Sequence, residues 1–145
     1  MPEGTKGVPW RLIIHTDGAA RGNPGPAGIG MVFSREDGEI VAEKKSFIGH
    51  ATNNVAEYKA LIAALQHAKA MGTREVLVRA DSELMVRQMM GQYKVRDAGL
   101  RPLYEEARQL AQGFDAFAIR HVPREENRRA DALANMAIDG KDQGE

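Results

Sequence analysis

Residues 12–30 of the chain read LIIHTDGAARGNPGPAGIG. An apolar run ends at a single carboxylate, Asp17, and a stretch rich in glycine and proline leads to a second apolar run that begins at Ile29. This pattern predicts a strand that brings Asp17 to the edge of a sheet, a turn over Gly18–Pro26 and a return strand over Ala27–Ser34. We therefore expect carboxylates from later parts of the chain to converge on Asp17.

The bulk composition is that of an ordinary globular domain. The chain has 145 residues and a formal net charge of zero, so binding to a polyanion must come from local placement of charge. It has no cysteine, which excludes disulfides and thiolate metal sites. Without an apolar run of about 20 residues or a signal-peptide core near its start, we expect a cytoplasmic protein with no membrane association. We expect one domain over residues 1–145, with an ordered core at about 10–138 and a flexible tail at 139–145.

The apolar residues first follow strand periodicity and then helical periodicity. Three strands over Trp10–Asp17, Ala27–Ser34 and Glu39–Ile48 predict an antiparallel meander. A helix over Asn54–Met71 follows, with Gly72 as its C-cap. The remaining predicted elements are a strand at Glu75–Ala80, helices at Glu83–Met90 and Leu100–Gln112, a strand at Phe114–Val122 and a helix at Asn127–Ile138. The order β-β-β-α-β-α-α-β-α predicts an α/β fold, a five-stranded mixed sheet with helices on both faces.

Four acidic residues stand at the ends of these elements, and each one alone has a structural explanation. Asp17 precedes a turn, where Asp is common. Glu57 stands three residues after Asn54, which is the spacing of a helix capping box. Asp81 occupies an expected helix N-cap, and Asp131 has the position of a solvated charge on the flank of the last helix.

Together, the four carboxylates indicate a metal site. Asp17 and Asp81 follow predicted strands at the edge where open α/β sheets bind ligands, and Glu57 and Asp131 lie near the starts of two helices. Like charges that meet repel one another unless a cation neutralises them, and oxygen-only ligands select hard ions such as Mg²⁺ or Mn²⁺. Two such ions about 3.5–4 Å apart would suit the hydrolysis of a phosphodiester.

The same residues carry a resemblance to a known family. Asp17–Gly28 closely resembles the first motif of type 1 ribonuclease H, Thr52–Glu57 the second, Asp81–Ser82 the third and Asn127–Ala134 the fourth. The resemblance implies the fold of that family and a metal-dependent endonuclease with two ions per site. Such an enzyme cuts the RNA strand of an RNA/DNA hybrid and leaves a 5′-phosphate and a 3′-hydroxyl. By motif position, the metal-binding catalytic carboxylates are Asp17, Glu57, Asp81 and Asp131.

Substrate contacts are predicted next to these motifs. An enzyme specific for hybrids must recognise 2′-hydroxyl groups, which short polar side chains and close backbone approach can do. By the resemblance, the residues that face the substrate are Gly18, Ala19, Asn23, Asn53 and Asn54. Each also has an explanation in turn formation or helix capping. We expect contact from Asn23 and Asn54 in particular, and a hydroxyl contact from Thr52 to a phosphate near a helix N-terminus.

The sequence departs from the better-known bacterial members in two places. Gly91–Gly99 is shorter than the Lys- and Trp-rich basic segment of those members, so the chain resembles a compact subgroup without this protrusion. The family's mobile histidine, which assists product release, would lie in a loop that here shrinks to Pro123–Glu126. His121 has the family's spacing from Asp131, but we expect it to stay in the last strand. We hypothesise that Arg124 replaces the histidine, because its guanidinium can reach a phosphate.

Two other functions stay open at this point. The same acids could cleave double-stranded RNA, because both duplexes approach A-form and expose 2′-hydroxyls. A non-catalytic nucleic-acid-binding module on the same fold is the third possibility, although such a module would typically lack one of the four acids. We expect the protein to be a monomer.

Overall fold

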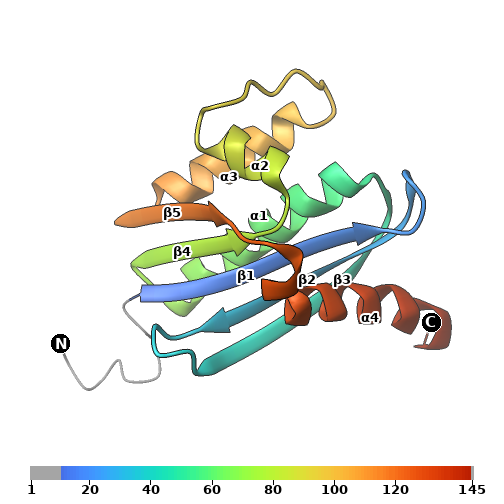
Figure 1. Cartoon of the computed structure of the whole chain (residues 1–145), viewed down its shortest axis with the longest axis horizontal. Helices are drawn as coiled ribbons and strands as arrows, with labels where there is room; N and C mark the ends of the chain where they lie inside the picture. Colours follow the sequence, from blue (N-terminus) through green and yellow to red (C-terminus); the bar gives the residue numbers. More distant parts are fainter. Residues whose placement is uncertain (1–10, 145) are drawn as a thin grey trace.

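A computed structural model describes the backbone of residues 11–144 and the side chains of residues 11–140. It has one sheet in the order β3-β2-β1-β4-β5, with helices on both faces (Figure 1). The strands are β1 (Arg11–Ala20), β2 (Gly25–Ser34), β3 (Ile40–Ala51), β4 (Glu75–Ala80) and β5 (Ala116–His121). The helices are α1 (Asn53–Met71), α2 (Glu83–Met89), α3 (Arg101–Gln112) and α4 (Arg128–Gly144), with a short 3₁₀ helix at Arg124–Glu126.

The sheet topology confirms the predicted fold class. β1, β2 and β3 form the antiparallel meander, whereas β4 pairs with β1 and β5 pairs with β4 in parallel. Thr16 stands opposite Ala80, and Ala80 stands opposite His121. The residues that follow Thr16 and Ala80 are therefore neighbours at one edge of the sheet, and these residues are Asp17 and Asp81.

The two faces of the sheet are covered differently. In Figure 1, α1 lies behind the sheet with α3 packed beside it, while α4 crosses the front of β2 and β3. The main core lies on the α1 face and includes fully buried Leu12 and Ile14 of β1 and Tyr58 of α1. On the other face, Gly28 and Gly30 of β2 lie directly against the backbone of α4, where a Cβ atom would collide with it. These two glycines let α4 approach the sheet closely enough to bring its first turns beside β1.

Several predicted boundaries were wrong. β1 continues through Gly18 and Ala19 to Ala20, because these residues pair with Ala27–Ile29 of β2, so the turn is shorter than predicted. The glycine and alanines of residues 18–20 suggested a loop, but these residues also fit the backbone pairing of two antiparallel strands. β5 begins later than predicted, at Ala116, and Trp10 lies outside the described residues.

The start of α1 and the end of α4 also differ from the predicted bounds. α1 begins at Asn53 because Thr52 is its N-cap: the Val55 amide donates to Thr52 Oγ1 at 3.2 Å. The C-cap of α1 is Gly72, as predicted, with a positive φ of 86°. α4 runs well past Ile138, where the last helix was expected to end, and Asp139 in this extension forms an ion pair with Arg21 at 2.6 Å. Within residues 11–144, no helix combines the length and the apolar character needed to cross a membrane.

Candidate active site

Asp17 lies within β1 at the level where the neighbouring parallel strand β4 ends, and Asp81 directly follows β4, so the two residues are side by side. Asp17 is buried, with 4% of its surface exposed, and Asp81 is half-buried in the connection to α2. The N-cap of α2 is Ser82, whose Oγ accepts from the Met85 amide at 3.3 Å. The capping explanation of Asp81 is therefore wrong, and its carboxylate is available for another purpose.

Glu57 reaches the same edge from the second turn of α1. The Gly18 amide donates to Glu57 Oε1 at 3.2 Å, which ties the helix to β1 next to Asp17. Because Thr52 caps this helix, the predicted capping box of Asn54 and Glu57 is wrong. A Cβ atom on Gly18 would collide with the backbone of α1 at Ala56, so this close approach requires glycine.

Asp131 comes from the first turn of α4, which lies on the face of the sheet opposite α1. The start of this helix is fixed by Asn127, a buried residue whose Nδ2 donates to the Thr16 carbonyl at 2.8 Å. The bond joins α4 to β1 one residue before Asp17. Asn127 belongs to the fourth sequence motif, but the sequence alone predicted no role for it.

The four carboxylates form one electrostatic cluster. Carboxylate oxygens of Asp17, Glu57 and Asp81 all lie within 4.8 Å of one another, and the carboxylate of Asp131 lines the same cleft and acts electrostatically on Asp17. Burial raises the pKa of Asp17, and the charges of Glu57, Asp81 and Asp131 raise it further. Burial, Asp81 and Asp131 likewise raise the pKa of Glu57, while the Gly18 amide acts in the opposite direction. Asp17 is central in position, because its strand β1 pairs with β4 next to Asp81 and is joined to α1 at Gly18 and to α4 at Thr16.

This arrangement fits a divalent cation. The donors are all oxygens, they converge from four separate elements, and burial and mutual repulsion make ionisation unfavourable without a positive charge. Such a donor set selects a hard ion. A metal site at these residues is the simplest reason for a fold to keep four acids together.

A cleft of about 500 Å³ opens above the cluster, and we call it the carboxylate cleft. Its lining includes all four acids and four of the predicted substrate-contact residues: Gly18, Ala19, Asn53 and Asn54. Arg124 also lines the cleft, from the 3₁₀ helix before α4. His121 stays within β5, as expected, and it is exposed; the strand ends at this residue, one residue earlier than predicted.

Among the described residues, two predicted substrate contacts lie outside the lining of the carboxylate cleft. Asn23 Oδ1 accepts from the Asn53 amide at 3.0 Å, and Asn53 Oδ1 in turn accepts from the Ala20 amide at 2.9 Å. These bonds join the β1–β2 turn to the start of α1. With Thr52 engaged in the helix cap, Asn23 and Thr52 both have structural roles, and substrate contact by either stays a prediction.

Asn135, which was not predicted from the sequence, also lines the carboxylate cleft from α4. A signal was present, because polar residues recur every four positions at Asn127, Asp131, Asn135 and Asp139. Four-residue spacing places side chains on one helix face.

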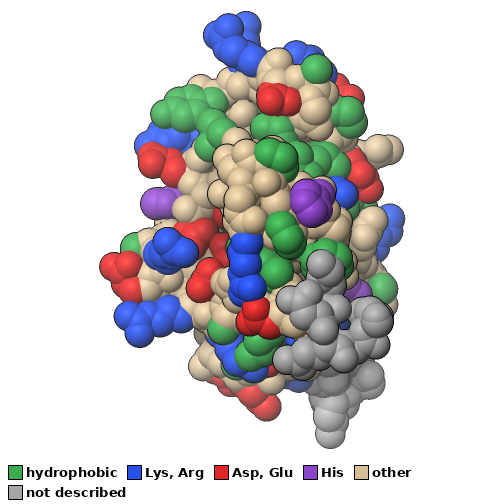
Figure 2. Space-filling model, turned by 90° about the vertical axis from the view of Figure 1, so that its right-hand side faces the viewer, with side chains coloured by type: hydrophobic (Ala, Val, Ile, Leu, Met, Phe, Trp, Pro, Cys, Tyr) green, Lys and Arg blue, Asp and Glu red, His purple; other side chains and the backbone are tan. Residues whose placement is uncertain are grey.

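Charged side chains of both signs are interspersed on the face of the molecule shown in Figure 2, in keeping with the zero net charge.

Comparison with known proteins identifies the family. A family model described as "Reverse transcriptase-like" matches residues 15–137. The crystal structure of RNase H1 from Halobacterium salinarum has a TM-score of 0.88 and 51% sequence identity, and the match covers 90% of this chain and 98% of that one. The chain belongs to the type 1 ribonuclease H family. This confirms the family predicted from the four motifs.

Further relatives match this chain at similar levels of sequence identity. LC11-RNase H1, solved in complex with an RNA/DNA hybrid, is 47% identical with a TM-score of 0.86, and the match covers 90% of this chain and 98% of that one. The ribonuclease HI sequence of Halobacterium salinarum is 51% identical over 89% of this chain, which spans 65% of that protein. A bifunctional protein of Mycobacterium tuberculosis is 47% identical over 89% of this chain, which spans 36% of it.

The raised pKa values predict a pH-dependent stability of the metal-free protein. Unfolded carboxyls ionise near pH 4, whereas Asp17 and Glu57 keep protons to higher pH in the folded state. The folded state then binds more protons than the unfolded state, so the free energy of unfolding should fall as pH rises above about 5. Thermal melts in EDTA from about pH 5 to about pH 8 would measure this decline.

The matched control for this decline is Asp17→Asn, which removes its main source. Comparing wild type with this variant also separates the carboxylate effect from the effect of His15. Burial and Arg79 lower the pKa of His15, so its contribution to the free energy of unfolding rises with pH. An equal slope of melting temperature against pH in the two proteins would contradict the assignment.

Asn127→Ala is expected to destabilise the protein by about 1–3 kcal/mol, because the buried Thr16 carbonyl would lose its side-chain donor. Urea unfolding followed by circular dichroism measures the change. The exposed neighbour Arg128 provides the control, since Arg128→Ala should stay within about 0.5 kcal/mol of wild type. Equal stabilities of the two variants would show that the bond from Asn127 to the Thr16 carbonyl does not stabilise the fold.

Proposed function

We propose that this chain is a ribonuclease H that hydrolyses the RNA strand of RNA/DNA hybrids to 5′-phosphate and 3′-hydroxyl products. The observation that carries the proposal is the convergence of Asp17, Glu57, Asp81 and Asp131 in one open cleft. The relative of known structure that is bound to an RNA/DNA hybrid supports the choice of substrate, at 47% identity over nearly all of that chain.

In this proposal the four carboxylates hold two divalent ions, Mg²⁺ or Mn²⁺. Asp17 would be the central ligand, because β1 lies beside β4 and is bonded to both α1 and α4, the elements that carry or precede the other three acids. When bound, the ions would lower the pKa of the attacking water and neutralise charge on the leaving 3′-oxygen. The chain supplies no nucleophile of its own: its part is to fix four oxygen donors from four elements and to leave the cleft open to a duplex.

The substrate contacts in this proposal come from the two segments that border Asp17. Gly18 and Ala19 offer backbone without bulk, and Asn53 and Asn54 are exposed at the start of α1. Short groups of this kind suit the shallow minor groove of an A-like duplex, where 2′-hydroxyls distinguish RNA from DNA. Because Asn53 Oδ1 is engaged by Ala20, the amide of Asn54 is the better candidate for direct contact.

Arg124 is proposed to contact the scissile region and to stabilise developing charge. It lines the carboxylate cleft from an exposed position, where a guanidinium can meet a phosphate. Arg124→Ala should therefore lower kcat by about 10- to 100-fold on a hybrid substrate. His121→Ala serves as the matched control and should leave turnover close to wild type. Unchanged turnover of Arg124→Ala, or a large loss in His121→Ala, would overturn this assignment.

The proposed function is tested by cleavage of matched, end-labelled duplexes. A hybrid, an RNA duplex and a DNA duplex of one sequence are incubated with Mg²⁺, with Mn²⁺ and with EDTA. We expect cleavage of the RNA strand of the hybrid with either ion and none in EDTA. Preferential cleavage of the RNA duplex would change the substrate class, and binding without cleavage under all conditions would indicate a non-catalytic module.

A further inference from the structure

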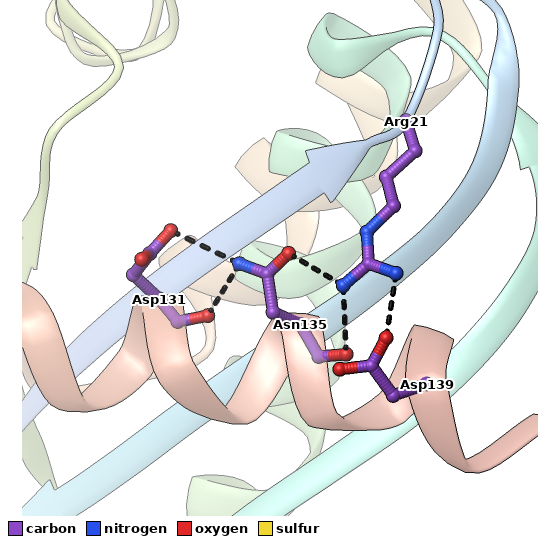
Figure 3. A network of polar contacts seen from close by, with 4 residues as sticks. All are labelled: Arg21, Asp131, Asn135 and Asp139. Atoms are coloured by element: carbon purple, nitrogen blue, oxygen red, sulfur yellow. Dashed lines mark hydrogen bonds and ion pairs between the residues drawn. The ribbon is translucent and has the colours of Figure 1, made fainter.

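A polar network joins α4 to the β1–β2 turn next to the carboxylate cleft (Figure 3). Arg21 Nη1 donates to Asp139 Oδ1 at 2.6 Å, and Arg21 Nη2 donates to Asn135 Oδ1 at 3.1 Å. Asn135 Nδ2 then donates to the Asp131 carbonyl at 3.0 Å and lies 3.4 Å from the Asp131 carboxylate oxygen Oδ1. The network therefore ends on one of the four proposed metal ligands.

The chemistry of Arg21 sets the orientation of the Asn135 amide. A guanidinium only donates hydrogen bonds, so the amide oxygen of Asn135 must face Arg21. Its NH₂ group then faces Asp131, where both nearby atoms are oxygens that only accept. The reversed amide would place donor against donor at Arg21 and oxygen against oxygen at Asp131. Arg21 thus presents the donor end of Asn135 to the Asp131 carboxylate.

Asp131 has more need of such a partner than Asp17 or Glu57. Glu57 is buried and accepts from the Gly18 amide, and Asp17 is almost fully buried between the elements. Asp131 is half-buried, and it lies outside the group of three whose oxygens approach within 4.8 Å. A half-buried carboxylate on a helix has several rotamers open to it unless a neighbour restricts them.

We propose that Asn135 is a positioning residue that orients the Asp131 carboxylate toward the metal site, with its own amide oriented by Arg21. The proposal rests on the proposed function only for the identity of Asp131 as a metal ligand. Partners that orient a metal ligand typically change metal affinity when they are removed. The affinity of the metal-free protein for Mn²⁺ is therefore the direct readout, and it needs no substrate.

The test is calorimetric titration of the full chain with Mn²⁺ alone. Asn135→Leu keeps a similar side-chain volume but removes the donor, and we expect about 10-fold weaker Mn²⁺ binding. The Mn²⁺ concentration for half-maximal hybrid cleavage should rise by a similar factor, with KM for the hybrid unchanged. Arg21→Leu should weaken binding less. The double variant should be no weaker than Asn135→Leu, because Arg21 acts through Asn135.

Arg129→Leu is the matched control. Arg129 also anchors α4 to the sheet, through two bonds of 2.8 Å to the Glu43 carboxylate, but it acts on β3 and not on Asp131. We expect unchanged Mn²⁺ affinity in this variant. Wild-type affinity in Asn135→Leu, whatever its melting temperature, would overturn the proposal, as would an equal loss in Arg129→Leu. Weaker Mn²⁺ binding in Asn135→Leu of a protein that cleaves no hybrid would support this inference while the proposed function fails.

Discussion

Asp17→Asn is expected to abolish hybrid cleavage, with kcat/KM falling at least about 10³-fold, and at the same time to raise the melting temperature of the metal-free protein. A fall of 10³-fold corresponds to about 4 kcal/mol of lost transition-state stabilisation. The cause is the central position of Asp17, whose carboxylate interacts with Glu57, Asp81 and Asp131. An amide of the same shape cannot replace a carboxylate as ligand, but it removes the repulsion that the metal-free fold must bear.

Initial rates on a labelled hybrid and thermal melts in EDTA measure the two effects on the same preparations. Asp115→Asn makes the same chemical change at an exposed residue, where Asp115 pairs with Arg74 at 2.8 Å. That variant should cleave like wild type and melt no higher. Asp17→Asn with near wild-type cleavage, or with a lower melting temperature than wild type in EDTA, would refute the central role given to Asp17.

The sheet and the helices could be predicted because their apolar periodicity is clear. The strand Glu75–Ala80 was predicted with its observed bounds, since turn signals stand on both sides of it. The errors fall where one residue type serves two purposes. Gly18 suggested a turn, but it lies within β1 and permits close contact with α1. Asn54 suggested a helix cap, but Thr52 two residues earlier provides the cap.

The convergence of the four carboxylates could be predicted because each stands at or near the end of an element expected from the sequence and because the motifs match a family. The roles of their supporting residues could not, because four-residue spacing shows that the polar side chains share one helix face but not what that face contacts. Whether Asn127 and Asn135 face β1 or solvent depends on how α4 is rotated on the sheet, and this is set by contacts with Gly28 and Gly30 of β2. Arg21 is 114 residues away from Asn135 in sequence, so their contact exists only in the folded chain.

Gly18→Ala is expected to lower kcat on the hybrid by about 10²-fold and to destabilise the protein by about 1–3 kcal/mol. The new methyl group would collide with the backbone of α1 at Ala56 and Glu57, so α1 must move away from β1. Glu57 moves with it, and the bond from the Gly18 amide to Glu57 Oε1 is lost or lengthened. A ligand displaced by about 1 Å is enough for a loss of this size.

Weaker Mn²⁺ binding distinguishes this displacement of Glu57 from a simple steric block of the substrate by the new methyl group. A block would raise KM for the hybrid and leave Mn²⁺ affinity unchanged, whereas displacement should lower both kcat and Mn²⁺ affinity. Gly140→Ala is the matched control, since a Cβ atom there has no neighbour within 4 Å and lies inside α4. That control should be more stable by about 0.5–1 kcal/mol and fully active. Wild-type kcat and Mn²⁺ affinity in Gly18→Ala would mean that the contact between β1 and α1 does not position Glu57.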